Sequence, residues 1–426
     1  MRSLYTLLLY LLAPLVLLRL AWRGLRAPDY WHRWPERFGS ISPALGERVI
    51  WLHAVSVGEV QAAEPLVRAL LEQYPEYSLL VTTVTPTGSA RVTALFGDAV
   101  AHVYAPYDLP GAVARFLQRV RPRLAVVMET ELWPNLFQSC KRGSIPLLLV
   151  NARLSEKSLR GYRRVRPLVA QTLDAISEIA AQGESDAERF RSLGAAPDRI
   201  TVTGNLKFEQ RIPPGLLERA AVLRRDWGGG RPVWVAASTH EGEDEQLLDV
   251  FGQLRGQFPD CLLVLVPRHP ERFPDVAELS RAHGYATLLR SEQRPCTSAT
   301  AVFIGDSMGE LPLFYAAADV AFVGGSLVPH GGHNLLEPAA LGVPVVTGPA
   351  VFNFTEISAL LLAAGACEQV ENSAELARVV SRWLGDANER HRVGQCGKQV
   401  VEKNRGALQA VQDMISRYLE EAGDKK

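Results

Sequence analysis

A glutamate near the start of the first regular segment has the position expected of a catalytic base. Glu59 lies in the sequence H-A-V-S-V-G-E-V, beside Gly58, after an apolar run and at the start of a predicted helix. A carboxylate at the carboxyl end of a parallel strand faces the side where such sheets bind ligands, and there it can take a proton from a hydroxyl group. A glutamate at a helix start can instead only balance the helix dipole. Both uses of Glu59 are open at this point.

Two more carboxylates and a lysine follow strands in the same half of the chain. Glu129 and Glu131 belong to M-E-T-E-L-W-P-N, after the fourth apolar run, and Lys207 belongs to G-N-L-K-F-E, after the last one. Since the carboxyl ends of parallel strands meet at one edge of a sheet, we expect Glu129 and Glu131 at the same edge as Glu59. Lys207 precedes the predicted domain linker, so it either reaches the space between the domains or forms a salt bridge at the hinge.

The second half of the chain contains a glycine-rich turn. The sequence G-G-S-L-V-P-H-G-G-H-N-L-L-E-P, from Gly324 to Pro338, follows a predicted buried strand and leads into a helix. Glycines let a backbone approach a ligand closely, and a helix N-terminus attracts phosphate. Glu337 can accept hydrogen bonds from both hydroxyls of a ribose. His330 and His333 are either metal ligands or hydrogen-bonding groups, and the second use is favoured because no third ligand has a suitable spacing.

Two further turns follow strands of the second half, and we expect them to meet the glycine-rich turn. They are P-R-H-P-E-R, from Pro267 to Arg272, and G-D-S-M-G-E-L, from Gly305 to Leu311. Arg268 is a candidate phosphate contact, and a surface salt bridge is the alternative. The acidic run from Glu241 to Glu245 opens a predicted helix, where carboxylates act as caps. No D-x-D motif of the kind that binds a metal and a nucleotide follows a strand.

The elements that must position these residues alternate between short apolar strands and longer helical segments. This alternation predicts an α/β protein with two Rossmann-like, doubly wound parallel sheets. We expect an N-terminal domain over 49–209, a linker over 210–216 and a C-terminal domain over 217–426, with ligands in a cleft between the domains. The second domain ends in a long, nearly uninterrupted helical tail from Ala374 to Glu421, which can pack against either domain. The predicted strands are 49–52, 79–84, 100–104, 124–128, 146–150, 176–181 and 200–202, then 233–236, 262–266, 301–304, 320–323, 343–347 and 366–370.

Composition and charge limit the classes of function. Forty-six basic and forty-six acidic residues give a formal net charge of zero, so the overall charge does not favour a nucleic-acid partner. Hydrophobic residues make up 47% of the chain, which is typical of a globular protein with substantial cores. The five cysteines are widely spaced and form no C-x-x-C pair. This argues against a disulfide framework or a structural zinc site and indicates a reducing compartment.

Residues 1–22 form a predicted membrane anchor, and a basic linker over 23–48 follows it. The run from Ser3 to Leu18 is rich in leucine and contains no charged residue. As a helix it is about 24 Å long against a hydrocarbon thickness of about 30 Å, so a short span and a helix in the plane of the membrane are both open. We expect the segment to be retained, because arginines follow it and no A-x-A cleavage site does. The positive-inside rule then places the rest of the chain in the cytoplasm.

The ordered motifs resemble those of the Kdo transferases of lipid A biosynthesis, the 3-deoxy-D-manno-oct-2-ulosonic acid transferases. The resemblance covers essentially the whole chain, through S-V-G-E, T-P-T-G, M-E-T-E-L-W-P-N, N-A-R-L-S, G-N-L-K-F, S-T-H-E-G-E, P-R-H-P-E-R-F, G-D-S-M-G-E-L and G-G-H-N-L-L-E. It implies a general base at Glu59 and transition-state stabilisation by Glu129 and Lys207. It also implies CMP contacts by Arg268, His269, Met308, Gly309, Glu310, Asn334, Leu335, Leu336 and Glu337.

The resemblance further implies a glycosyltransferase of the GT-B fold that acts at the inner membrane. The donor would be CMP-Kdo and the acceptor a lipid A precursor (lipid IVA), with inversion at the anomeric carbon and with neither a metal nor a cofactor. Two alternatives share this architecture, a UDP-sugar transferase and a nucleotide-sugar 2-epimerase. A third is a non-catalytic, membrane-tethered binder of nucleotide sugars, which would have no use for a base at Glu59.

Overall fold

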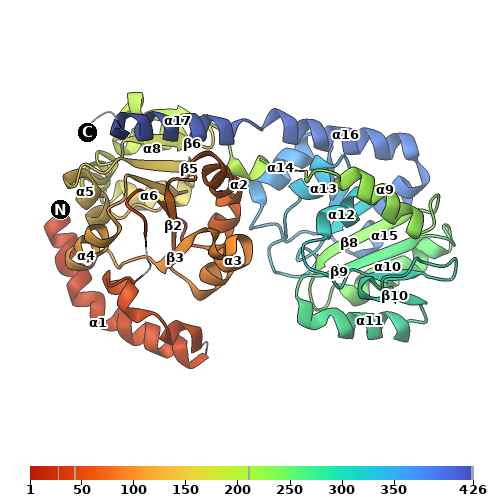
Figure 1. The fold of residues 1–426 in the computed structure, drawn as a ribbon. Helices are drawn as coiled ribbons and strands as arrows, with labels where there is room; N and C mark the ends of the chain where they lie inside the picture. The colour runs from red at the N-terminus through yellow and green to blue at the C-terminus, as the bar shows by residue number, and fades with distance from the viewer. Residues whose placement is uncertain (27, 43–44, 210–211, 424–426) are drawn as a thin grey trace. The chain divides into compact units, whose positions relative to one another are not determined.

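The chain folds into two compact α/β units (Figure 1). The computed structural model describes residues 1–26, 28–42, 45–209 and 212–423. The first unit comprises Met1–Glu209 and Arg405–Lys426, and the second comprises Gln210–Asn404. Positions 210 and 211, with which the predicted linker begins, lie outside the described residues.

Seven parallel strands form the sheet of the first unit, in the order β3-β2-β1-β4-β5-β6-β7. Successive residues of β1 belong to cores on opposite faces, with Val49 and Trp51 on one side and Ile50 and Leu52 on the other. The strands therefore read as uninterrupted apolar runs, because helices cover both faces of a parallel sheet. The strands are β1 (Val49–His53), β2 (Ser78–Thr83), β3 (Ala101–Tyr104), β4 (Leu124–Met128), β5 (Leu147–Ala152), β6 (Glu178–Ala181) and β7 (Ile200–Val202).

Helices α4 to α8 contribute to the core that contains Trp51, and helices α2, α3 and α17 to the core that contains Ile50. The N-terminal segment forms α1 (Arg2–Arg26), which is long and apolar enough to cross a membrane. The helices are α2 (Val57–Gln73), α3 (Pro86–Phe96), α4 (Pro110–Val120), α5 (Pro134–Arg142), α6 (Glu156–Arg163), α7 (Arg166–Leu173), α8 (Glu184–Leu193) and α17 (Ala407–Gly423).

The C-terminal tail differs from the prediction of one long helix in the second domain. It consists of α15 (Ser373–Gly385), α16 (Ala387–Lys403) and α17, and α17 belongs to the first unit. Asp386 ends α15 and caps α16, since its side chain accepts hydrogen bonds from two backbone N–H groups. Val411 and Ile415 of α17 are fully buried in the core of the first unit, which explains why this helix packs there.

The second unit contains a second sheet of seven parallel strands, in the order β10-β11-β9-β8-β12-β13-β14. The edge strand β10 was not predicted. The strands are β8 (Val233–Thr239), β9 (Leu262–Pro267), β10 (Thr287–Leu289), β11 (Val302–Ile304), β12 (Val320–Val323), β13 (Val345–Thr347) and β14 (Cys367–Gln369). The helices, besides α15 and α16, are α9 (Leu216–Asp226), α10 (Asp244–Arg255), α11 (Phe273–Ala282), α12 (Leu311–Ala316), α13 (Leu336–Ala340) and α14 (Thr355–Ala363).

Each sheet has a switch point where strand order reverses, between β1 and β4 in the first unit and between β8 and β12 in the second. The register aligns His53 of β1 with Val127 of β4, and Ala237 of β8 with Val323 of β12. Connections leave in opposite directions at such a point, and the carboxyl ends of the strands there are the usual place for a ligand. Glu59 follows β1, Glu129 and Glu131 follow β4, and the glycine-rich turn follows β12.

Candidate active site

Glu59 lies at the switch point of the first unit, in the first turn of α2. Ser56 is the N-cap, and its hydroxyl accepts a hydrogen bond from the backbone N–H of Glu59. The Glu59 carboxylate accepts hydrogen bonds in return, at 2.8 Å from the backbone N–H of Val55 and at 2.9 Å from the Ser56 hydroxyl. Both uses considered for Glu59 are therefore compatible, because the cap holds the carboxylate in a fixed place.

The environment of Glu59 shifts its acidity into the physiological range. Its side chain is buried, with 8% of the residue exposed. Burial raises the pKa of Glu59 to about 7, with a smaller contribution from the negative charges of Glu131 and Glu129, while the hydrogen bonds from Val55 and Ser56 oppose the rise. A carboxyl group with such a pKa can accept a proton from a substrate and release it again near neutral pH.

Glu129 follows β4 in an unusual backbone conformation. Its φ of 55° lies in the left-handed region, which side chains other than glycine rarely adopt. The backbone N–H of Glu129 still donates to the carbonyl of Val150, at 3.0 Å, and the side chain reaches Lys207 with 3.6 Å between Oε1 and Nζ. Strained residues of this kind concentrate at functional sites. The structure thus brings Glu59, Glu129 and Lys207 together at one edge of the first sheet.

Glu131 is a fourth charged group at this edge. One of its oxygens accepts a hydrogen bond from the Trp133 indole N–H at 2.8 Å. Burial raises the pKa of Glu131, the Trp133 hydrogen bond opposes this, and the charge of Glu129 adds to the rise. The cluster therefore contains three carboxylates around one lysine, so it holds a proton more readily than isolated glutamates would.

Three amide side chains fix the turn that carries Lys207, η5 (Leu206–Phe208). Oδ1 of Asn151 accepts a hydrogen bond from the Leu206 N–H at 3.0 Å. Gln182 donates to the Asn151 carbonyl at 3.0 Å and accepts from the Asn205 amide at 2.9 Å. Asn151 belongs to the N-A-R-L-S motif, whereas Gln182 gave no signal in the sequence. Together they connect the ends of β5 and β6 to Lys207.

In the second unit a buried carboxylate occupies the glycine-rich turn after β12. Glu243, which is fully buried, accepts hydrogen bonds from four backbone N–H groups at 2.7 to 3.0 Å, those of His240, Gly325, Ser326 and Leu327. Consecutive N–H groups that converge in this way form an anion-binding nest. The sequence predicts a helix-capping role for this glutamate, but its side chain makes no capping hydrogen bond and instead holds the start of α10 against the glycine-rich turn.

The helix after the glycine-rich turn, where the sequence predicts a phosphate contact, is short. Helix α13 contains only five residues, and the N–H of Leu336 donates to Oδ1 of Asn334 at 3.1 Å. Asn334 also donates to Oε1 of Glu337 at 3.0 Å. Leu335 and Leu336 are buried in the core, so only their backbone groups are available to a ligand. The phosphate contact at this helix N-terminus stays a prediction.

Four histidines gather beside the glycine-rich turn. His240 and His333 lie with 2.8 Å between their Nε2 atoms, and the rings of His240 and His330 stack at 4.1 Å between centroids. Burial lowers the pKa of His240 to about 4 and that of His333 to about 3, and the nearby Arg268 contributes to both shifts. These two rings are thus neutral at neutral pH. Among the residues that the structure describes, no group of three or more His, Cys, Asp or Glu side chains could hold a metal ion.

Arg268 and His269 leave β9 next to these histidines. The backbone N–H of Arg268 donates to the Thr239 carbonyl at 3.0 Å, which ties the end of β9 to that of β8. The Arg268 guanidinium is close enough to lower the pKa of both His240 and His333. His269 is exposed, with 3.9 Å between its Nδ1 and an oxygen of Glu271. The predicted neighbourhood of Arg268 and the glycine-rich turn is therefore present within this unit.

The remaining predicted nucleotide contacts lie after β11. Met308 is 66% exposed, and Gly309 adopts a positive φ of 80°. Glu310 accepts two hydrogen bonds from Arg290, both at 2.9 Å, and this pairing lowers its pKa. Glu310 and Arg290 line a pocket of about 510 Å³. Arg290 follows the short strand β10, so the sequence gave no reason to connect it with this turn.

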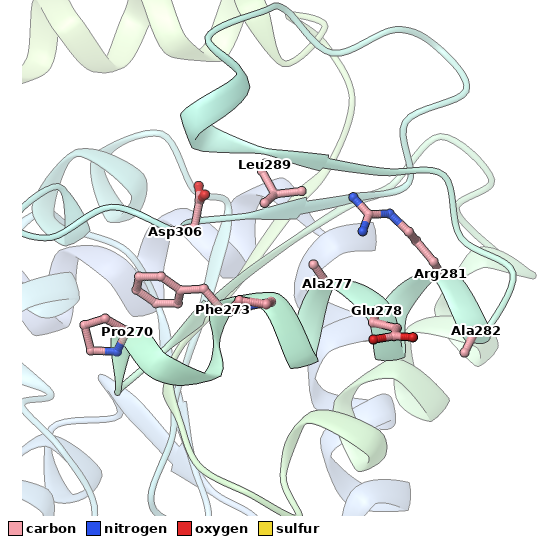
Figure 2. Close-up of a pocket in the computed structure, with 9 residues that line it drawn as sticks. Pro270, Phe273, Ala277, Glu278, Arg281, Ala282, Leu289 and Asp306 are labelled. Atoms are coloured by element: carbon pink, nitrogen blue, oxygen red, sulfur yellow. The ribbon is translucent and has the colours of Figure 1, made fainter.

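A larger hollow, of about 850 Å³, opens beside α11 and is shown in Figure 2. Phe273, Ala277 and Arg281 from α11 line it together with Leu289 of β10 and Asp306. None of the predicted site residues lines this hollow. It is therefore distinct from the residues expected to bind the nucleotide.

One basic segment of the first unit went unnoticed in the sequence. From Arg153 to Arg166 six of fourteen residues are lysine or arginine. Lys157, Arg160 and Arg163 are exposed on α6, which follows β5 at the same edge as the carboxylates. Burial raises the pKa of Tyr162 in this helix, and the negative charge of Glu131 adds to the rise. Tyr162 therefore lies within the electrostatic reach of Glu131. The high local density of arginine was the signal that could have revealed it.

Comparison with known proteins matches both units to glycosyltransferase families. Residues 32–210 match the family model of 3-deoxy-D-manno-octulosonic-acid transferase (kdotransferase), and residues 235–400 match that of glycosyl transferases group 1. The chain is 44% identical to 3-deoxy-D-manno-octulosonic acid transferase from Haemophilus influenzae, over 98% of this chain and 99% of that protein. It is 38% identical to the transferase of the same name from Bordetella pertussis, over the same shares of the two chains.

Solved structures show a similar fold. The structure of UDP-GlcNAc 2-epimerase from Neisseria meningitidis bound to UDP-GlcNAc superposes with a TM-score of 0.56 at 13% identity, covering 87% of this chain and 100% of that one. At this identity the likeness establishes the two-sheet, GT-B-like fold but no shared activity. The identity to the transferases over nearly the full length is what decides between the alternatives, and the chain belongs to the Kdo transferase family of glycosyltransferases.

Proposed function

We propose that this Kdo transferase moves Kdo from CMP-Kdo to a lipid A precursor, lipid IVA, with inversion at the anomeric carbon. The observation that carries the mechanism is Glu59, whose carboxylate is buried, fixed by Val55 and Ser56, and has a pKa of about 7. A general base works best when its pKa is near the working pH, because it is then both deprotonated and basic enough.

In the proposed step a hydroxyl oxygen of the acceptor attacks the anomeric carbon of Kdo. The new carbon–oxygen bond forms as the bond from that carbon to the CMP phosphate oxygen breaks, and CMP leaves with the electron pair. The hydroxyl proton moves to the Glu59 carboxylate. Because attack and departure occur on opposite faces, a single displacement inverts the configuration, and one carboxylate suffices as base.

Lys207 and Glu129 are proposed to stabilise the transition state. The ammonium of Lys207 is held 3.6 Å from Glu129, at the edge where Glu59 acts. Kdo carries a carboxylate and the leaving group is a phosphate, so negative charge must be balanced during the reaction. A cation held in place before the reaction balances charge without a cost of reorganisation. Glu129 holds the Lys207 ammonium in place through their ion pair.

The second unit is proposed to bind CMP. Arg268 supplies the phosphate contact beside the neutral His240 and His333, which can donate or accept hydrogen bonds without adding charge. Glu337, oriented by Asn334, accepts the ribose hydroxyls. Glu243 acts on the same site as a positioning residue, because it holds Gly325 and its neighbours in one conformation.

The basic segment of α6 is proposed to bind acidic groups of the acceptor. Arg160 and Arg163 are exposed, and Tyr162 between them connects the helix to the environment of Glu131. Arginine is suited to phosphate and carboxylate groups because its planar guanidinium donates two parallel hydrogen bonds. The sequence-based expectations of no metal, no cofactor and no nucleic acid remain part of the proposal, as does action at the cytoplasmic side of the inner membrane.

Calorimetric titration tests the donor assignment. Purified full-length protein is titrated with CMP, UMP and UDP under identical conditions. The proposal expects a higher affinity for CMP than for either uridine nucleotide. In a separate assay of transfer, activity should continue after treatment with a chelator. Preference for UDP would overturn the choice of CMP-Kdo as donor. Loss of activity with EDTA that added metal restores would overturn the metal-free mechanism alone.

A further inference from the structure

Helix α1 lies along the first unit and is covered on a single stripe over its whole length. The covered positions recur every three or four residues, which places them on one face of a helix. No other pattern of partial burial runs through the described residues of α1. The stripe consists of Arg2, Tyr5, Thr6, Leu9, Ala13, Leu17, Leu20, Ala21 and Gly24.

The N-terminal end of α1 is hydrogen-bonded to the first unit. The Tyr5 hydroxyl donates to Oδ2 of Asp108 at 2.9 Å, and the Thr6 hydroxyl donates to Oδ1 of Asn135 at 3.1 Å. Asp108 and Asn135 are buried and bonded to each other, and Asp108 also accepts the N–H of Leu136 at the start of α5. Since Asp108 follows β3 and Asn135 follows β4, this end of α1 lies at the carboxyl edge of the sheet.

The other end of α1 is also packed against the same unit. Leu20 is only 8% exposed. Gly24 has no room for a side chain, because an added Cβ would lie 2.0 Å from Nε1 of Trp31 in the short helix η1 (Pro28–Trp31). Trp31 in turn stacks on Trp34. Both ends of α1 are thus held by residues of the folded unit.

These contacts are incompatible with a helix that spans a bilayer. Tyr5 and Leu20 are about 22 Å apart along the helix axis. If α1 crossed the membrane, the loop that carries Asp108 and the first turn of α5, which carries Asn135, would have to lie deep in the hydrocarbon, where irregular backbone exposed to lipid does not occur. Arg19, which is exposed on α1, would also enter the hydrocarbon.

We propose that α1 is an in-plane membrane helix that docks on the first unit and inserts its outward face into one leaflet of a phospholipid bilayer. The outward face is apolar, with Leu7, Leu11, Leu15 and Leu18 each more than half exposed. Arg19 and Arg23 are exposed near one end, so the lipid partner is a leaflet with anionic headgroups. Such helices bury their apolar face about 5–10 Å deep.

Docking of α1 also sets the position of the carboxyl edge of the first sheet relative to the membrane. Asp108 and Asn135 mark the carboxyl edge of the first sheet, which also carries Glu59 and Glu129. The helix therefore presents this edge close to the lipid surface instead of acting as a loose tether. The inference concerns how the chain meets a bilayer, and it holds whichever sugar is transferred.

Cysteine labelling in membranes tests which side the N-terminus occupies. Cys296 and Cys396, which are partly exposed, are first replaced by serine in the full-length chain, and Ser3→Cys or Lys398→Cys is then introduced. A membrane-impermeant maleimide is applied to spheroplasts and to inverted vesicles. An in-plane helix predicts that Ser3→Cys and Lys398→Cys, both at exposed positions, label from the same side. Labelling of the two from opposite sides would overturn the proposal.

Disulfide cross-linking in the same membranes tests the docking itself. The pair Thr6→Cys and Asn135→Cys should form an intramolecular disulfide on mild oxidation, because the native side chains are in contact. The matched control is Leu7→Cys with Asn135→Cys, since Leu7 points outward and is 55% exposed. Absence of the first cross-link in protein that retains its activity, or equal cross-linking of both pairs, would show that α1 is not docked as described.

Discussion

The ammonium nitrogen of Lys207 lies 3.6 Å from Oε1 of Glu129, although the two residues are separated by 78 positions in the sequence. Glu129 leaves β4 with a positive φ, and Lys207 leaves β7 in a turn that Asn151 fixes. The pair therefore exists only because two strand ends of one sheet meet. Its cation is placed at the edge where Glu59 has a raised pKa.

Replacing Lys207 by methionine should reduce kcat by about 10²–10³, the usual effect of losing one preorganised charge. The affinity for CMP should change little, since the proposed nucleotide contacts belong to the second unit. Lys141→Met is the control, because Lys141 pairs with Asp174 at the surface. The double variant of Lys207→Met and Glu129→Gln should lose less activity than the sum of the single losses. Additive losses would show that the two residues do not act as a pair.

The pH dependence of kcat/KM should report Glu59. Activity should rise as pH increases through about 7, because the base is protonated and inactive below its pKa and deprotonated above it. Glu131→Gln removes one negative charge that raises the Glu59 pKa, so the acidic limb should move to lower pH. Glu76→Gln, a change at an exposed position, should leave the limb in place. A limb that shifts equally in both variants would rule out Glu59 as the titrating group.

Glu243→Gln should weaken CMP binding by about tenfold or more, as expected for loss of charge-assisted hydrogen bonds to a buried group. A glutamine presents an N–H₂ group to N–H donors that the carboxylate now satisfies. Faster amide hydrogen exchange over residues 324–332 should accompany the loss, because the glycine-rich turn is no longer held. Glu245→Gln, at an exposed position two residues later, is the control. Normal exchange and normal CMP affinity in Glu243→Gln would remove its positioning role.

Arg268→Ala and Glu337→Ala should each weaken CMP binding by about 1.5–3 kcal/mol, the first through the phosphate and the second through the ribose. The ribose contact is checked by repeating the titration with 2′-deoxy-CMP. The difference in affinity between the parent and Glu337→Ala should be smaller for 2′-deoxy-CMP than for CMP. Arg281→Ala, in the hollow beside α11, is the control. If Arg281→Ala alone weakens binding, the nucleotide occupies that hollow instead.

The architecture could be predicted because its signals are local. Apolar runs alternate with helical segments, and a parallel sheet that is covered on both faces requires such runs. The strand-end positions of Glu59 and Glu129 followed from the same pattern. Helix α17 could not be assigned to the first unit in this way, since its apolar face fits either core and only packing against residues such as Leu66 and Leu70 decides the matter.

Details of the donor site depend on long-range contacts, which a sequence does not reveal. The sequence around Glu243 indicates only a helix cap, because the hydrogen bond from the Gly325 N–H comes from a residue 82 positions away. Arg290 follows a strand too short to recognise, and it pairs with Glu310 across the turn after β11. The short length of α13 and the hydrogen bond from the Leu336 N–H to Asn334 could not be read from the sequence either, since both depend on how the glycine-rich turn folds.

The most direct test is mass analysis of the product formed by wild-type protein and Glu59→Gln. The glutamine amide oxygen can still accept the Val55 N–H, and its shape matches that of glutamate, so the variant should fold and bind CMP like the parent. With CMP-Kdo and lipid IVA, the account predicts that wild-type protein adds Kdo to the acceptor and releases an equal amount of CMP. It predicts that Glu59→Gln is slower by about 10²–10⁴. An unmodified acceptor with wild-type protein, or a Glu59→Gln rate above a tenth of wild type, would contradict it.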